Sequence, residues 1–437
     1  MQKYNEYKDS GILWVGKVPS HWKVKRVKHN FSLKNEKSYE TNPTILSLTQ
    51  KGIKVRDISN NHGQIATTYE GYNKVNKGDI VLNPMDLLTG FVDSSPYDGV
   101  ISPAYSILKP NTQVNNDYYN RLIQVLYFNE YLFGLGEGVS QEFRWTLKNE
   151  KLLNLEILEP PIEEQSLISS FIDKKTSEID LLISDKEKQI DLLKEFQQSI
   201  INELVTKGFH SDEKMKERGI KSVGQELWKS IQMRYASEFI QTGPFGSQLH
   251  SYEYIQNGIP VINPVNIRNG EIAENLESTI SEKKANELNR HRMKKGDIIF
   301  GRRGEIGRAA LISECEEGWI CGTGCLLIRP KKGLFESEFL KFVLSSSYVK
   351  QQLLMNSVGS TMDNLNCSIL ASLRILLPPL TVQKEIAEYL NNVSNQVFML
   401  IESIKSEIQK LIEYRQSLIY EAVTGKNDVR EYKKVMS

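Results

Sequence analysis

The most regular hydrophobic pattern in the 437-residue chain belongs to two long segments, residues 160–208 and 378–426. In each, apolar residues recur at steps of three and four, which places them on one face of an α-helix. Prolines precede both segments and a glycine stands near the end of each, as expected at the two ends of a helix. Helices of this length need a partner for the apolar face, so we predict that the two segments pair as a coiled coil.

The apolar positions expected at the helix–helix interface form one set in each segment. Polar Lys175, Lys186 and Gln197 fall where the first stripe continues, so that side of the interface is imperfect. The first set is Ile168, Ile172, Ile179, Leu182, Ile190 and Leu193, and the second is Ile386, Leu390, Val393, Val397, Ile404, Ile408 and Leu411.

The two long segments are copies of each other. They align without a gap at an offset of 218 residues, and the same offset relates KGDIVL (77–82) to KGDIIF (295–300). A leading segment at 7–22 is echoed at 215–228. Each half therefore consists of a leading segment, a globular head, a double proline and a long helix, which predicts an internal pseudo-two-fold repeat. The predicted domains are 1–158 (first head), 159–209 (first helix), 210–376 (second head), 377–426 (second helix) and 427–437 (tail).

Both heads are predicted to be mixed α/β. Short strand-like runs such as YSILKP and CLLIRP alternate with Gly, Pro and Asn turns and with helical stretches. Outside the shared strands the heads hardly match. Divergent loops on a common frame are typical of proteins that recognise different targets.

Composition narrows the class of protein. Hydrophobic residues make up 40% and charged residues 25%, as in ordinary globular proteins. No apolar run is long enough for a membrane span and the N-terminus does not resemble a signal peptide, so we expect a cytoplasmic protein without a membrane partner. The four cysteines and six histidines lack metal-site spacing, so no metal is expected. The net charge of +1 argues mildly against a stand-alone nucleic-acid binder.

Several short motifs, doubled in one order along the whole chain, resemble those of a known family. They are PPIEEQ and PPLTVQ at the helix starts, SGILWVGKVPSHW (10–22), KGDIV and KGDII, TGPFGSQLHSYEYIQNGIPVI (242–262) and GRRGEIGRAALI (301–312). The sequence is similar to the specificity subunits of type I restriction-modification systems.

The resemblance implies two target-recognition domains, each reading one half of a split, asymmetric DNA sequence, joined by two long antiparallel coiled-coil helices. Two methyltransferase subunits would dock along the helices, and a DNA-translocating nuclease subunit could then join. Catalysis would belong to these partners, including adenine N6 methylation with S-adenosylmethionine. This chain would be non-catalytic and hold no cofactor.

In the second head, three loops carry candidate DNA contacts. Arginines can bind phosphate or a guanine edge, glycines allow close approach to phosphate, and asparagine can read adenine. A plain turn is the competing interpretation at each loop. The candidates are Arg302, Arg303, Gly304 and Arg308; Ser247 and Gln248; and Asn263, Asn266 and Arg268.

In the first head, the candidate DNA contacts lie in three loops, and exposed loop charges are the default interpretation. They are Gln50, Lys51, Lys54 and Arg56 in the first loop, Asn83 in the second, and Gln141 and Arg144 in the third.

Two other functions are weighed against DNA recognition. NPMD (83–86) partly matches the Asn/Asp-Pro-Pro-aromatic motif of amino-methyltransferases, but it lacks the second proline and the aromatic residue. This disfavours an enzyme. A coiled-coil scaffold whose heads bind protein, not DNA, stays open as the alternative.

Overall fold

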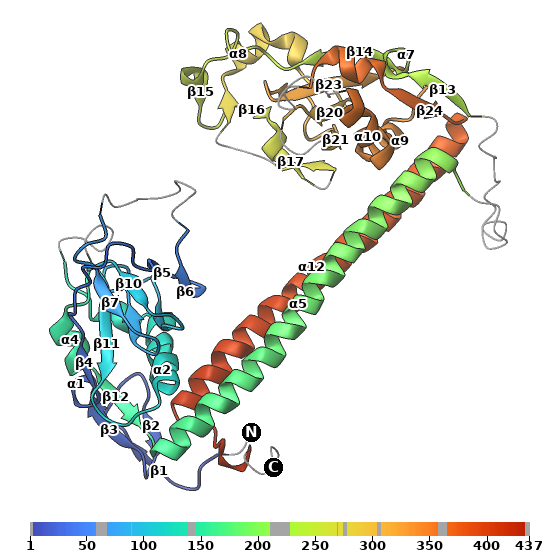
Figure 1. Cartoon of the computed structure of the whole chain (residues 1–437). Coiled ribbons are helices and arrows are strands. Elements are labelled where there is room, and N and C mark those ends of the chain that lie inside the picture. The colour runs from blue at the N-terminus through green and yellow to red at the C-terminus, as the bar shows by residue number, and fades with distance from the viewer. Residues whose placement is uncertain are drawn as a thin grey trace. The chain divides into compact units, whose positions relative to one another are not determined.

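The computed structural model describes residues 3–57, 68–88, 90–138, 145–209, 228–268, 270–273, 278–303, 307–356 and 365–432. The chain divides into two compact units, one formed by residues 1–186 and 406–437 and the other by residues 187–405. The long helices are α5 (Ile162–Lys207) and α12 (Leu380–Val423). Each unit therefore contains one head and a part of both long helices (Figure 1).

The first head is built on an antiparallel sheet of order β4-β11-β8-β9. The pairs β1-β2, β3-β12, β5-β6 and β7-β10 surround it. The strands are β1 (Tyr7–Asp9), β2 (Lys17–Pro19), β3 (Lys23–Arg26), β4 (Phe31–Leu33), β5 (Leu46–Thr49), β6 (Gly52–Val55), β7 (Asn73–Val75), β8 (Ile80–Leu82), β9 (Val92–Ser94), β10 (Gly99–Ile101), β11 (Ser106–Pro110) and β12 (Glu156–Glu159). The helices are α1 (Val27–Asn30), α2 (Asn116–Phe128), α3 (Tyr131–Gly134) and α4 (Asn149–Asn154), and the short η5 (Arg430–Tyr432) lies in the tail.

The second head repeats this plan with a sheet of order β14-β23-β20-β21 and a pair β13-β24. It adds the sheet β15-β19-β16-β22 and the hairpin β17-β18. The strands are β13 (Lys229–Gln232), β14 (Ser237–Thr242), β15 (Tyr254–Ile255), β16 (Ile259–Ile262), β17 (Ile267–Arg268), β18 (Glu271–Ile272), β19 (Thr279–Ile280), β20 (Ile298–Gly301), β21 (Ala309–Leu311), β22 (Ile320–Cys321), β23 (Cys325–Pro330) and β24 (Arg374–Leu377). The helices are α7 (Met233–Ala236), η2 (Ser251–Glu253), η3 (Pro264–Asn266), α8 (Glu282–Glu287), η4 (Asn289–His291), α9 (Ser337–Ser345), α10 (Ser347–Asn356) and α11 (Cys367–Ser372).

The central sheets are covered on both faces, which explains their continuous apolar runs. In β8, Ile80 and Leu82 face the core shared with the long helices, while Val81 faces a separate cluster with the β5-β6 and β7-β10 pairs. In β20, Ile298 and Phe300 face the helices and Ile299 faces the opposite cluster. Side chains alternate across a strand, so a sheet covered on both faces needs apolar residues at every position. This is the structural reason for the repeated KGDIV and KGDII motifs.

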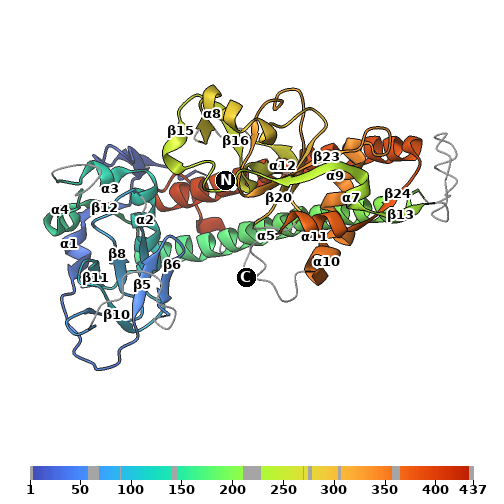
Figure 2. The same cartoon turned by 90° about the horizontal axis from the view of Figure 1, so that it is seen from above.

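The two long helices are antiparallel. In each unit their segments lie side by side in both views (Figure 1, Figure 2). In the first unit, Asp180 pairs with Arg415 at 3.2 Å and Lys186 pairs with Glu407. Moving forward along α5 thus means moving backward along α12. The predicted fold class, mixed α/β heads joined by two long antiparallel helices with an internal repeat, is confirmed.

One residue of the predicted helix interface, Leu182, lies at its edge, where it lines a groove with Leu411 of α12. Leu182 is 52% exposed, whereas the neighbouring Ile183 is half-buried and lies on the line from Ile179 to Lys186. The other predicted positions are buried or half-buried. The run Leu181-Leu182-Ile183 is apolar at three consecutive positions, so spacing alone does not identify which residue faces the partner helix. Lys186 falls on the interface as expected, where the ion pair with Glu407 accommodates it.

Each head is fastened to the start of a long helix by the same glutamine. Gln165 donates its Nε2 to the carbonyl of Pro160 at 2.9 Å and accepts at Oε1 from the N–H of Asn115, the N-cap of α2, at 2.9 Å. Gln383 donates to the carbonyl of Pro378 at 2.8 Å and accepts from the N–H of Glu336, the N-cap of α9, at 2.9 Å. The repeated PP…Q motif is therefore a joint between helix and head.

The far end of each long helix is also held in a repeated way. Gly425, after α12, has φ +70° and lies against Trp22, while Gly208, after α5, has φ +72° and lies against Trp228. A positive φ favours glycine, and a Cβ here would collide with Pro19 in the first case and the indole in the second. The C-terminal end of each long helix thus packs against a tryptophan of a leading segment.

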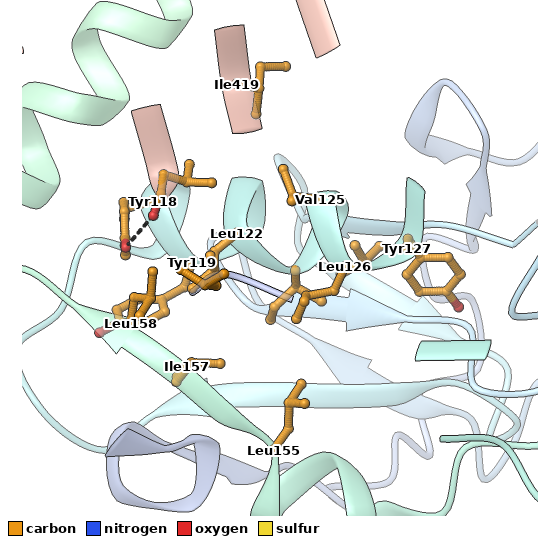
Figure 3. Close-up of a cluster of buried hydrophobic side chains, with 14 of the residues drawn as sticks. Tyr118, Tyr119, Leu122, Val125, Leu126, Tyr127, Leu155, Ile157, Leu158 and Ile419 are labelled. Atoms are coloured by element: carbon orange, nitrogen blue, oxygen red, sulfur yellow. Dashed lines mark hydrogen bonds between the residues drawn. The ribbon is translucent and has the colours of Figure 1, made fainter. Parts of the chain in front are cut away.

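Head and helices share one core in each unit. In the first unit, Tyr118 and Leu122 of α2 pack with Ile157 of β12 and Ile419 of α12 (Figure 3). Tyr118 also donates its hydroxyl to the carbonyl of Val423 at 3.1 Å. Such continuous packing holds each head firmly on its part of the helix pair. In the part of the chain that the structure describes, no helix is both long enough and apolar enough to cross a membrane.

Candidate functional site

A buried aspartate supports the loops of each head. The Asp79 carboxylate accepts from the N–H of Asn76 at 2.8 Å and from Lys34 at 2.7 Å. Its counterpart Asp297 accepts from the N–H of Lys294 at 2.9 Å and holds Arg329 through two hydrogen bonds of 2.7 and 2.6 Å. The hydrogen bonds to this carboxylate raise the pKa of Arg329. The buried charge is neutralised in both heads, so β8 and β20, whose far ends carry candidate loops, begin in the same way.

In the second head, glycines bring two of the predicted loops to one point. A Cβ on Gly243 would lie 1.9 Å from the carbonyl oxygen of Gly322, and a Cβ on Gly322 would lie 2.5 Å from the side-chain oxygen of Asn263. Only glycine allows this approach of three backbones. The loop 243–248, which follows β14, and the turn 263–266, which follows β16, therefore leave their two sheets at adjacent positions.

The Asn263–Asn266 turn gathers two of the predicted arginines. Arg308 donates from Nη1 to the carbonyl of Pro264 at 3.4 Å, and Arg268 donates from Nε to the carbonyl of Val265 at 3.4 Å. Asn266 is buried, and its side-chain oxygen accepts from the N–H of Asn263 at 2.9 Å. Asn266 thus has the turn-forming role that was the alternative to adenine reading.

Arg302 and Arg308 lie on either side of the hairpin between β20 and β21. The N–H of Gly301 bonds the carbonyl of Arg308 at 2.8 Å, and the N–H of Arg302 bonds the carbonyl of Gly324 at 2.9 Å. Arg302 also donates from Nε to the carbonyl of Leu365 at 2.7 Å, and Arg303 is exposed. Gly304 lies outside the described residues. The structure therefore brings the arginines of the hairpin and those of the turn to one edge of the second head.

Gln248 closes the loop of residues 243–248 through hydrogen bonds to Phe245. Its Oε1 accepts from the N–H of Phe245 at 2.9 Å, and its own N–H donates to the carbonyl of Phe245 at 2.8 Å. Ser247 is exposed on the same loop. In this closed loop the Phe245 side chain is 61% exposed.

In the first head, the candidates fall into two described loops. Gln50, Lys51 and Lys54 are exposed on the β5-β6 hairpin, and Arg56 follows it with its N–H bonded to Ile45. Asp93 fixes this hairpin by accepting from the N–H of Ile53 at 3.0 Å. Gln141 and Arg144 lie outside the described residues.

Asn83 forms a tight turn at the end of β8. Its side-chain oxygen accepts from the N–H of Met85 at 3.1 Å, and its carbonyl accepts from the Tyr127 hydroxyl. Burial raises the pKa of Tyr127, so this donor stays protonated. Met85 is exposed at the tip of the turn. Whether any of the candidates in the two heads contacts DNA stays a prediction. What the sequence interpretation missed are the apolar residues at the loop tips, which stand next to the polar residues that it selected.

Comparison with known proteins connects these features to a family. Residues 245–410 match the family model described as the type I restriction modification DNA specificity domain. The chain is 25% identical over 368 residues to the type I restriction enzyme MjaVIII specificity subunit of Methanocaldococcus jannaschii, covering 82% of each chain. It is 23% identical to the EcoBI specificity subunit of Escherichia coli, covering 85% of this chain and 79% of that one.

The chain resembles type I restriction enzyme specificity subunits over most of its length.

A solved structure shares the fold of this chain. It comes from work on complex assembly and conformational transition of the type I R-M system, and it matches with a TM-score of 0.65 at 14% identity, covering 93% of this chain and 98% of that one. The resemblance drawn from the doubled motifs is therefore confirmed. The matched specificity domain, residues 245–410, includes the glycine-bracketed loop, the Asn263–Asn266 turn and the arginine hairpin of the second head.

Proposed function

We propose that this chain is the DNA-recognition and scaffolding subunit of a type I restriction-modification complex. Each head reads one half of a split DNA target, and the halves differ because the loops of the two heads differ. The observation that carries the proposal is the repeat itself. Two sheets of the same strand order, each supported by a buried aspartate, carry different loops at the ends of equivalent strands.

Docking of two methyltransferase subunits is supported by apolar side chains that the helix pair leaves uncovered. In the first unit, Leu182 and Tyr414 line a shallow apolar groove together with Leu411. The offset of 218 residues relates Leu182 to Leu400 and Tyr414 to Phe196, and all four side chains are half or more exposed. Exposed apolar patches mark protein interfaces. A patch that recurs with the repeat suits two copies of one partner.

The chemistry is assigned to the partners. In this proposal the methyltransferase subunits bind S-adenosylmethionine and methylate adenine N6, and a translocating nuclease subunit can join the same complex. The chain itself provides DNA specificity and assembly without catalysis, and we place the complex in the cytoplasm.

Co-expression with the methyltransferase subunit encoded beside this chain tests the proposal. Sequencing of host DNA for N6-methyladenine is expected to reveal one split, asymmetric motif. A confirmed complex that adds no methylation would contradict it. If the heads bind protein instead of DNA, the isolated complex would also fail to retain a methylated-motif duplex in a binding assay.

A further inference from the structure

Polar residues hold the recognition loops, and apolar residues occupy their tips. In the second head, Asn266 closes the 263–266 turn and Gln248 closes the 243–248 loop, each through its side-chain oxygen. The residues left outward are Val265, 57% exposed, and Phe245, 61% exposed. Water is a poor environment for both side chains, so a loop that is braced to expose them is built for contact with an apolar group.

The first head has the same arrangement on an unrelated loop. Asn83 closes its turn by accepting from the N–H of Met85, and Met85 is the exposed residue. Both turns read Asn-Pro followed by an apolar residue, NPMD and NPVN, yet they occupy positions that the 218-residue offset does not relate. Two loops at unrelated positions thus each expose an apolar side chain beside an asparagine that accepts a backbone N–H, from Met85 in the first head and from Asn263 in the second.

The surroundings of Val265 are cationic. Arg268 and Arg308 both donate hydrogen bonds to carbonyls of the turn, at Val265 and Pro264. Arg302 lies across the β20-β21 hairpin from Arg308. An apolar side chain on a turn whose carbonyls accept from two arginines fits a ligand that is polyanionic overall and carries a small apolar group.

Double-stranded DNA offers one such group in the major groove. The C5-methyl of thymine projects there, and it distinguishes a T·A pair from the others through apolar contact. Valine is short and restricted at χ1, so it loses little conformational freedom when it packs against a methyl group.

We propose that Val265 and Phe245 are specificity-determining residues of the second head, which contact thymine C5-methyl groups in its half-site. The asparagines and the glutamine of these loops position them. This inference rests on the proposed function, and it assigns readers that the polar motif residues do not provide.

The test uses the complex of the full chain with its methyltransferase subunit and duplexes carrying its methylated motif. Each thymine of the half-site assigned to the second head is replaced in turn by deoxyuridine, which removes only the methyl group. The wild-type complex is expected to lose about three- to tenfold in affinity at one or more positions, on the scale of burying one methyl group.

The variants Val265→Ala and Phe245→Ala are expected to bind the thymine duplex about three- to tenfold more weakly than wild type and to become insensitive to deoxyuridine at the matching position. Their affinity for the deoxyuridine duplex should equal that of wild type, which also shows that the variants fold. Val55→Ala, an equally exposed valine of the first head, is the matched control and should retain full sensitivity to deoxyuridine in the second half-site.

Three results would overturn the inference: a half-site without thymine, a wild-type complex indifferent to deoxyuridine, or variants that lose affinity equally for both duplexes. Failure of the proposed function looks different, because the wild-type complex would then neither methylate nor bind a split motif.

Discussion

Gln165 and Gln383 show how a single side chain can join a long helix to a head. Each satisfies a proline carbonyl and the N–H of a helix N-cap residue, and both glutamines are almost fully buried. The glutamine is therefore a residue whose removal leaves two backbone groups without partners.

We predict that Gln383→Ala lowers the free energy of unfolding of the second unit by about 2–4 kcal/mol, because a buried unsatisfied group costs about 1–3 kcal/mol. Urea unfolding of the full chain measures this. Gln409→Ala, on the exposed surface of α12, is the matched control and should change the value by less than about 0.5 kcal/mol. Equal effects of the two substitutions would disprove the role of the joint.

His291 provides a prediction about pH. It is buried in the second head, and burial together with the neighbouring Arg290 lowers the pKa of its imidazole. The unfolded chain then binds the proton more readily than the folded chain. The neutral imidazole therefore makes its full contribution to the free energy of unfolding above about pH 6.5, the ordinary pKa of histidine in the unfolded chain. This contribution is lost as the pH falls towards the lowered pKa of the folded chain.

We expect the free energy of unfolding of wild type to fall, relative to that of His291→Phe, by up to about 1.4 kcal/mol per pH unit below this point. Parallel curves for the two proteins between pH 5 and 8 would contradict the prediction, because they would show that folding does not change the pKa of His291.

At the scale of elements, the helix pair leaves one repeated surface uncovered. Leu182 and Tyr414 of the first unit correspond to Leu400 and Phe196 of the second, and the ion pair between Lys186 and Glu407 borders the first patch. Serine at these exposed positions costs little in the free chain but removes apolar area from a docked partner.

The paired change Leu182→Ser with Tyr414→Ser is expected to reduce the complex from two methyltransferase subunits to one, and so is Leu400→Ser with Phe196→Ser. All four changes together should abolish docking. Native mass spectrometry of the co-purified complex gives the stoichiometry. Leu354→Ser, an exposed leucine of α10, should leave two subunits bound; if the paired changes also leave two, the patches are not the docking surface.

Helices and strands with a regular apolar spacing were predictable from the sequence. Which of several adjacent apolar residues faces the partner helix was not. The long helices and the β8 and β20 strands follow from apolar spacing, because the burial of a whole face dictates it. Leu182 was assigned to the interface in place of Ile183, because three adjacent apolar residues fit the stripe at more than one helix rotation.

The candidate loops were predictable, but the roles within them were not. Asparagine can brace a turn or read a base, and only the position of its side chain decides between them. Asn266 and Gln248 turned out to brace their loops, and that depends on backbones brought together by Gly243 and Gly322, far apart in the sequence. Exposed Val265 and Phe245 carry no polar signal that a sequence motif would select.

At the scale of the whole molecule, the repeat separates a constant frame from a variable head within each unit. In the first unit, β3 pairs with β12 and Trp22 seats the end of α12, so residues 1–30 belong to the frame. The Trp22 indole also donates to the buried Glu164 of α5 at 3.1 Å. An exchange of residues 31–155 therefore replaces the sheet, its loops and α2, while it keeps the β3-β12 pair and the contacts of Trp22 to both long helices.

We predict that replacing residues 31–155 with the corresponding segment of another specificity subunit changes one half of the methylated motif and leaves the other half intact. The physical reason is that each unit has its own core and each head its own loops. Sequencing of N6-methyladenine in the host measures the outcome. The reciprocal exchange of residues 237–373 should change the opposite half. If either exchange altered both halves, the heads would not be independent readers, because a change in one core would then have to reach loops built on a separate core.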